Sequence, residues 1–409
     1  MTERTDPPDD RADQGQELDH DDGHDSEPEL DTRDSDPEAD GGLNSDPTVS
    51  NPPSGHDRSP TTTATRPWRH RIEVAGIVAT GLLAVAMIAF IVVDWLRMAP
   101  EWTLVPPYAG LLFDQFVVVG MWIDHFLGTN VFWLPSTWRA VATGVLIGVV
   151  APLVGAFLVH RQMALIGETL AHAAFAGVAV GVIVIAVTGW TGSLLFVALV
   201  VSALVALGLQ WLTTHTSSYG DVPIAIVLSG SFAVGTLLIS WGREFAPISV
   251  DVEGFLFGSL AIVTADGARM MALLTVAVVA AVAVNYKQLL FITFDERAAR
   301  VARLDVDLQN TLLVVLTAVV VVGAMQILGV ILVAAMLVVP VATASQIATS
   351  FRETLSLSIL FGQFSVLGGL TFSILASLPP GGSIVVVAIG FYLLAVVGSS
   401  RSTTAISMH

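Results

Sequence analysis

Ten apolar runs, each close to the length that a helix needs to cross the hydrocarbon core of a bilayer, follow one another from residue 72 onward. We predict transmembrane helices over residues 72–93, 138–159, 163–187, 192–213, 223–241, 267–286, 308–326, 329–346, 354–377 and 382–398. The stretch from Leu308 to Ala348 is too long for one crossing, so we divide it near Gln326–Gly329, where a polar residue and a glycine permit a tight turn. The pattern predicts an all-α membrane protein of about ten transmembrane helices.

Two further segments are not predicted to cross. Residues 94–137 combine scattered aspartates with aromatic residues of the kind that anchor chains at the membrane surface, and we predict an interfacial, partly amphipathic connection there. These aromatic residues are Trp95, Trp102, Tyr108, Trp122, Trp133 and Trp138. Residues 247–265 contain EGFLFGSLAIV, which is too short to cross and predicts a re-entrant or surface helix.

The N-terminal residues differ sharply in composition from the rest. Residues 1–67 are rich in Asp, Glu, Pro, Gly, Ser and Thr, and such a segment cannot bury enough apolar surface to fold, so we predict a disordered acidic tail. Of the formal net charge of −17, residues 1–60 supply −15, because they hold 19 acidic and 4 basic side chains. The remainder is apolar and almost neutral. The single lysine and the many acids are typical of a salt-adapted proteome.

Composition also excludes several functions. The chain has no cysteine, which removes thiolate metal sites, disulfides and cysteine nucleophiles. A P-loop needs Gly-Lys-Ser/Thr, and the only lysine, Lys287, lies in Tyr-Lys-Gln. Without a basic stripe we expect no nucleic-acid partner.

The distribution of basic residues predicts the orientation in the membrane. With the N-terminus in the cytoplasm, ten basic residues lie at inner helix ends and four at outer ends. The inner set is Arg66, Arg69, Arg71, Arg161, Lys287, Arg297, Arg300, Arg303, Arg352 and Arg401, and the outer set is Arg97, Arg139, Arg243 and Arg269. We expect a multi-pass protein of the cell membrane with both termini in the cytoplasm.

Ionisable residues at membrane depth are costly and therefore mark candidate functional sites. Glu168 and His172, in MALIGETLAHAAFAGVAVG, are four residues apart, so a carboxylate and an imidazole share one helical face. Both side chains are ligands for divalent transition metals. Two ligands on one helix could form a transient waypoint for an ion, although a structural pair with hydrogen bonds to neighbouring helices is also compatible with the spacing.

Small residues and prolines indicate closely packed, kinked helices. Gly144 and Gly148, and Gly177 and Gly181, are spaced so that neighbouring helices can approach closely. Pro152 and Pro340 lie inside predicted spans.

The longest predicted inner loop, residues 287–307, reads KQLLFITFDERAARVARLDVD. Its centre is rich in helix-forming residues, with Asp295 and Glu296 suited to a helix N-terminus and Arg300 and Arg303 suited to its end. We predict either a short surface helix that docks a cytoplasmic partner or an ordinary solvated loop.

Five segments together resemble the integral-membrane permease subunit of ABC importers for zinc, manganese or iron. They are HRQMALIGETLAHAAFAGVAVG, EGFLFGSLAIV, FDERAARVARLDV, LGVILVAAMLVVPVATA and LPPGGSIVVV, and they occur in the family's order over roughly residues 137–398. The resemblance implies three parts: the tail (1–67), an extra span with its interfacial connection (68–136) and a permease domain of about nine spans (137–400).

The resemblance further implies a homodimeric permease in membrane lipid, a separate cytoplasmic ABC ATPase and an extracytoplasmic metal-binding protein. Glu168 and His172 match the family's acidic residue and histidine on the transport path. The segment 294–306 matches its ATPase-coupling region, which here carries Asp295, Glu296, Arg297, Ala298, Arg300 and Arg303. Glu168 replaces the more usual Asp, Ala171 replaces Ser, and Arg303 stands where the family often has glycine.

The leading interpretation is a permease, not an enzyme, that moves a divalent metal ion by alternating access powered by the ATPase subunit. No cofactor is expected in this chain, and the metal ion is its substrate. The alternatives are an ABC permease for an iron chelate or cobalamin, an ion-coupled secondary metal transporter, and a membrane scaffold or sensor that does not transport. Six predicted spans without ionisable residues argue against ion coupling.

Overall fold

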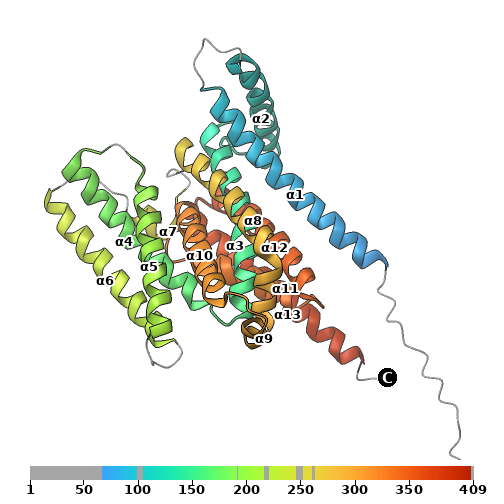
Figure 1. Ribbon diagram of the computed structural model, residues 1–409. Helices are drawn as coiled ribbons and strands as arrows, with labels where there is room; N and C mark the ends of the chain where they lie inside the picture. The colour runs from blue at the N-terminus through green and yellow to red at the C-terminus, as the bar shows by residue number, and fades with distance from the viewer. Residues whose placement is uncertain are drawn as a thin grey trace, which may run out of the picture. The chain divides into compact units, whose positions relative to one another are not determined.

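Helices account for nearly all of the residues that the computed structural model describes, and these residues contain no strand (Figure 1). These residues are 67–98, 105–190, 192–215, 221–245, 252–259 and 263–406, and they belong to one unit, Thr63–His409. The acidic tail predicted over residues 1–67 lies outside them except for Pro67, and so does the predicted anchor Trp102.

The helices follow the apolar runs of the sequence. Their bounds are α1 Pro67–Leu96, α2 Val105–Leu127, α3 Pro135–His160, α4 Leu165–Thr188, α5 Leu194–His215, α6 Val222–Phe245, α7 Val252–Phe257, α8 Ala265–Phe294, α9 Glu296–Val301, α10 Val306–Leu328, α11 Val333–Ser345, α12 Phe351–Ala376 and α13 Pro380–Ile406. Each of the ten predicted spans corresponds to one of these helices.

The span predicted over residues 329–346 is wrong in length. Residues 329–332 form a turn, and α11 has only 13 residues, too few to cross a bilayer alone. Ten of the described helices are long and apolar enough to span. This set includes α2, which the sequence did not predict as a span, and leaves out α11, which it did. The total agrees with the sequence-based prediction, although its members differ.

The contacts of α2 place it at one end of the helix bundle. Phe113 of α2 stacks on Phe90 near the end of α1, with ring centroids 5.6 Å apart. Asp124 in its last turn accepts hydrogen bonds from the backbone N–H groups of Val131, Phe132 and Trp133, just before α3. Since α1 ends and α3 begins at this same end, α2 connects the two there, and the interfacial position of this segment stays a prediction.

Trp138 is not the surface anchor that its place in the aromatic segment predicted. Its side chain is buried and lies against Phe90 and Phe116, with ring centroids 6.1 and 5.9 Å away. The aromatic residues of α1, α2 and α3 form a cluster of their own here, which buries Trp138 away from the surface.

A buried carboxylate that the sequence reading missed joins α1 to α3. Asp94 is 3% exposed and accepts hydrogen bonds from Arg97 and Arg139, whose Nε atoms lie 2.8 Å from its two oxygens. A buried charge needs such partners, because an unpaired carboxylate would strongly destabilise the fold. We call this side of the bundle the Asp94 end.

The opposite side of the bundle, which we call the α9 end, gathers the ends of α3, α5, α8 and α11 and the starts of α4, α6, α10 and α12. The rings of His160, Phe294 and Phe351 meet there, with centroids 5.0 to 6.4 Å apart. Basic side chains divide between the two ends as predicted. Arg97, Arg139 and Arg269 lie at the Asp94 end, and Arg161, Arg297, Arg300, Arg303 and Arg352 lie at the α9 end.

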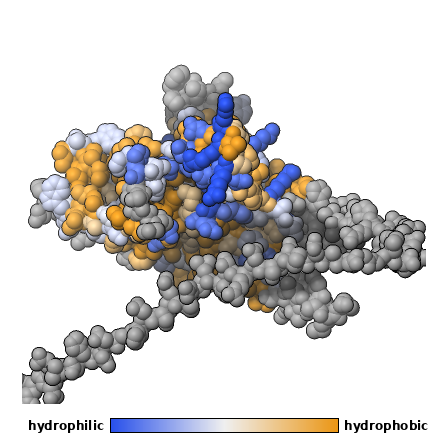
Figure 2. All heavy atoms as spheres, turned by 60° about the horizontal axis from the view of Figure 1, so that its bottom comes forward, coloured by the Kyte–Doolittle hydropathy of each residue, from blue (hydrophilic) through white to orange (hydrophobic). Residues whose placement is uncertain are grey.

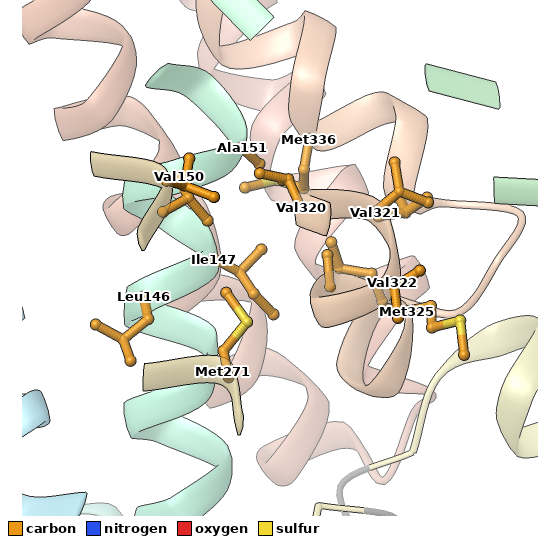
Figure 3. Close-up of a cluster of buried hydrophobic side chains, with 14 of the residues drawn as sticks. Leu146, Ile147, Val150, Ala151, Met271, Val320, Val321, Val322, Met325 and Met336 are labelled. Atoms are coloured by element: carbon orange, nitrogen blue, oxygen red, sulfur yellow. The ribbon is translucent and has the colours of Figure 1, made fainter. Parts of the chain in front are cut away.

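Helix α3 forms the centre of the core, because almost every residue from Ala140 to Leu158 is buried. Figure 3 shows its side chains Leu146, Ile147 and Val150 with Met271 of α8 and with Val320, Val321, Val322 and Met325 of α10. Neighbouring backbones come very close to it. A Cβ at Gly155 would collide with the carbonyl oxygen of Leu337 in α11, and one at Gly148 would lie 3.0 Å from the backbone of Gln363 in α12.

A second close contact joins α7, the end of α10 and the start of α13. Gly258 and Gly329 both adopt positive φ, at 82° and 75°. A Cβ at Gly258 would collide with the Ile327 carbonyl oxygen, and one at Gly381 with the Leu328 carbonyl oxygen. We call Gly258, Gly329 and Gly381 the glycine junction. The six residues of α7 are too few to cross a bilayer, as predicted for the EGFLFGSLAIV segment.

The glycine junction predicts a sharp difference between two adjacent positions. Gly381→Ala should destabilise the protein by about 1–3 kcal/mol, because the added methyl group would overlap backbone that cannot move aside. Gly382→Ala, where a Cβ meets nothing within 4 Å, is the matched control and should leave the thermal unfolding midpoint unchanged or slightly raised. Thermal unfolding in detergent measures both. Equal midpoints for the two variants would contradict the packing.

Candidate metal path and coupling helix

Glu168 and His172 lie in the first two turns of α4, at the α9 end. The helix begins at Leu165, directly after a turn at Arg161–Ala164, which places Glu168 in its first turn. Glu168 is exposed and His172 is half-buried. The pair therefore lies on a face of α4 that the described residues leave partly uncovered.

Aromatic side chains hold the imidazole of His172 in place. Phe232 of α6 meets it edge to face, with ring centroids 5.1 Å apart, and Phe232 also stacks on Phe175 one turn further along α4. The Nδ1 atom of His172 is buried without a hydrogen-bond partner among the described residues. The other ring nitrogen, Nε2, is therefore the one available to an ion.

The described residues do not complete a metal site around this pair. Among the described residues, no group of three or more His, Cys, Asp or Glu side chains lies close enough together to hold a metal ion. A tetrahedral or octahedral ion at Glu168 and His172 needs further ligands beyond these two side chains.

The predicted surface helix is present as α9. Asp295 separates it from α8, and its carboxylate accepts a hydrogen bond of 2.8 Å from the N–H of Ala298. The backbone N–H of Asp295 donates to the Phe291 carbonyl oxygen, so one residue ends α8 and caps α9. Ala299 is fully buried against Ile292 and Val306, which fixes the inner face of α9.

Glu296 is held by two arginines. Its oxygens lie 2.9 Å from Arg300 and 3.5 Å from Arg161, which ends α3, and Arg300 also lies 3.5 Å from Asp307 of α10. Burial lowers the pKa of Arg161 and Glu296 partly offsets this, whereas its hydrogen bond with Glu296 raises the pKa of Arg300. In the sequence, Arg161 counted only as one of the ten basic residues at the inner helix ends, and no feature of the sequence predicted its ion pair with Glu296.

The outer face of α9 remains open. Arg297, Arg300 and Val301 are exposed, and Val301 reaches 85% exposure, which is unusual for a branched apolar side chain. Figure 2 views the molecule with the lower side of Figure 1 turned forward. Polar side chains gather in the middle of this view, with apolar side chains around them. Of the six predicted coupling residues, Asp295, Glu296 and Ala298 therefore build the helix, and Arg297 and Arg300 reach its surface.

A cavity of about 850 Å³ lies beside α9, among the helix ends. Its lining includes Arg161, Glu296, Arg300 and Asp307, together with Asp221 before α6. The charged residues that tie α9 to the bundle thus also form the wall of a hollow at the α9 end.

Arg303 follows α9 in a conformation that favours glycine. Its φ is 59°, and the surrounding turn is closed by hydrogen bonds from the N–H groups of Ala302 and Leu304 to the carbonyl oxygens of Ala298 and Ala299. The left-handed conformation explains why a glycine would fit here.

Comparison with known proteins gives consistent results. The model of the family described as "ABC 3 transport family" matches residues 134–399. A "Probable metal transport system membrane protein" of Treponema pallidum is 33% identical over 268 residues, which cover 64% of this chain and 97% of that protein. The "Manganese transport system membrane protein MntC" of Listeria innocua is 33% identical over 63% of this chain and 88% of that protein.

A solved structure is similar as well. The match is a chain of "PsaBC from Streptococcus pneumoniae in complex with Fab", with 31% identity and a TM-score of 0.57, and it covers 64% of this chain and 91% of that chain. Helices α1 and α2 precede the matched residues 134–399.

The strain at Arg303 predicts a stabilising substitution. Arg303→Gly should raise the free energy of unfolding by about 0.5–1 kcal/mol, because glycine adopts positive φ without steric cost. Arg303→Ala removes the same charge but keeps the Cβ, so it should bring no such gain. Thermal unfolding midpoints of the two variants separate backbone strain from charge. A gain in Arg303→Ala equal to that in Arg303→Gly would rule out the backbone explanation.

Proposed function

The chain belongs to the ABC 3 transport family, and from this premise we propose that it is the permease subunit of an ATP-driven importer for divalent metal ions. Its matched relatives carry names that refer to metal and manganese transport. ATP hydrolysis belongs to a separate cytoplasmic subunit, and an extracytoplasmic protein delivers the ion.

The observation that carries the ion-binding part of the proposal is the pair on α4. Glu168 is exposed, and His172 has its Nε2 atom available while Phe232 fixes the plane of its ring. A carboxylate and an imidazole suit zinc, manganese and iron alike. The pair selects divalent transition metals as a class.

The surroundings of His172 favour weak, transient binding. A histidine in a resident metal site usually donates its second ring N–H to a carboxylate or carbonyl oxygen, which strengthens it as a ligand. The Nδ1 atom of His172 is buried with no such partner in the described part of the chain. When Nε2 binds a metal, the proton has to sit on Nδ1 in a place where no acceptor receives it. An ion bound this way leaves readily, as transport requires.

A second copy of the chain completes the site in our proposal. Glu168 is exposed on a face of α4 that the described helices leave partly uncovered, and the described residues of one chain supply two ligands there. Two copies related by a twofold axis would place two such pairs on one path. The two copies together then supply four ligands, a glutamate and a histidine from each.

We assign the α9 end to the cytoplasm. Basic side chains are more numerous there than at the Asp94 end, as the positive-inside rule requires. The exposed face of α9 then meets the ATPase, and Glu296 transmits its movement to α3 through Arg161 and to α10 through Arg300 and Asp307.

The metal path predicts a loss of uptake when either ligand is removed. Glu168→Ala and His172→Ala should each lower uptake of zinc or manganese into proteoliposomes by on the order of tenfold or more. His215→Ala is the matched control, because His215 is exposed at the end of α5, where its ring stacks on Trp211 and its Nδ1 atom lies within hydrogen-bond distance of Thr214. Unchanged uptake in both α4 variants, at equal protein levels, would refute the site.

The coupling helix predicts a separate defect. Charge reversal of Asp295 and Glu296 should weaken association with the ATPase, because α9 loses its cap and its ties to Arg161 and Arg300. Arg297→Glu changes the exposed face alone and should weaken association without altering the thermal midpoint. Arg352→Gln, an exposed arginine at the start of α12, is the control. Normal pull-down and normal ATPase stimulation in the α9 variants would refute docking at this helix.

A further inference from the structure

An apolar groove of about 700 Å³ runs between α1 and α8. It is lined along α1 by residues between Ile88 and Trp95, and along α8 by residues between Arg269 and Ala280. Figure 1 shows α1 passing beside α8, and the small side chains of Ala272, Ala277 and Ala280 leave space between the two helices. Every lining residue except Arg269 is apolar or aromatic.

The length of the groove corresponds to one leaflet of a bilayer. Arg269 and Ala280 are separated by three helical turns, or about 16 Å along the axis of α8. Half of a hydrocarbon core of about 30 Å is about 15 Å. A single acyl chain lying along α8 would fill this depth, with its polar end at Arg269.

Arg269 has donors left over at the mouth of the groove. Its Nη1 atom is 2.9 Å from Asp266, and its Nη2 atom is 3.2 Å from the sulfur of Met98, which is a weak acceptor. Its Nε atom is buried without a hydrogen-bond partner. Asp266 is largely exposed, so this ion pair contributes little and leaves the guanidinium able to bind a stronger acceptor.

Trp95 marks the level of the headgroups. It lines the groove near the end of α1 and is 56% exposed, in the position where tryptophans gather at the membrane–water interface. It lies close in sequence to Met98, whose sulfur contacts Arg269. An aromatic ring and a cation thus meet at the same end of one apolar groove.

From this arrangement we propose that the groove binds one anionic phospholipid, with an acyl chain between α1 and α8 and the phosphate on Arg269. A phosphate oxygen accepts from the guanidinium in a charge-assisted hydrogen bond. Because α1 precedes the residues that match the family model, the site belongs to the added N-terminal helix. The bound lipid seals the thin contact between that helix and α8.

Lipid binding to the full chain in detergent tests the proposal by native mass spectrometry. The probes are phosphatidylglycerol and phosphatidylcholine with identical acyl chains, and wild type should retain phosphatidylglycerol in preference. Arg269→Gln should lower that preference by about tenfold, the loss expected for one charge-assisted hydrogen bond. Arg352→Gln removes an arginine at the opposite end of the bundle and should retain it.

Blocking the groove tests the position of the acyl chain. Ala277→Phe should fill the groove and abolish retention of both lipids, whereas Ala283→Phe, on the exposed side of α8 outside the lining, should change neither. Equal lipid retention in wild type, Arg269→Gln and Ala277→Phe would overturn the proposal. Loss of a dimer mass with Ala277→Phe, with no change in bound lipid, would also overturn it by showing that a second copy occupies the groove.

Discussion

Close contact between helix backbones is the constraint on which the rest of the structure depends. In a membrane the hydrophobic effect does not drive one apolar helix onto another, so the helices are held by van der Waals packing and scattered hydrogen bonds. Van der Waals contact is greatest where a glycine lets two helix backbones touch without a Cβ between them. Gly155 of α3 meets Leu337 of α11 in this way, and Gly148 meets α12. Pro152 lies in the same stretch of α3, where α12 also crosses it at Gly362. Helix α3 therefore becomes the fixed centre around which the others are placed.

The same constraint connects the two ends of the bundle. Inside the bundle, the glycine junction ties α7 to the end of α10 and the start of α13 by backbone contact. At the α9 end, α10 begins beside α9 and shares the charges of Arg300 and Asp307 with it. A movement of α9 consequently acts on a helix whose far end is clamped. Such a bundle responds by shifting whole helices, because interlocked backbones do not deform locally.

The sequence predicted features that depend on composition and local spacing, and it missed those that depend on tertiary partners. Apolar length located the helices, and the spacing of Glu168 and His172 placed both on one face of α4. The shortness of α11 follows from the turn at Gly329, whose positive φ depends on contact with α7. Asp94 looked like one more scattered acid, because its partner Arg139 is 45 residues away. Glu296 was read as part of a docking surface, and its tie to Arg161 arises only when α3 and α9 meet.

The incomplete site on α4 is consistent with a path for ions. A resident metal centre surrounds its ion with ligands and supports each ligand with a hydrogen bond, which makes release slow. Here the aromatic contact with Phe232 fixes His172 sterically without strengthening it as a ligand, and the side chain of Glu168 is exposed. Geometry is thus controlled while affinity stays low. That combination suits a protein that has to recognise an ion and then release it, and it requires the rigid scaffold on the other sides of α4 that the glycine contacts with α5 provide.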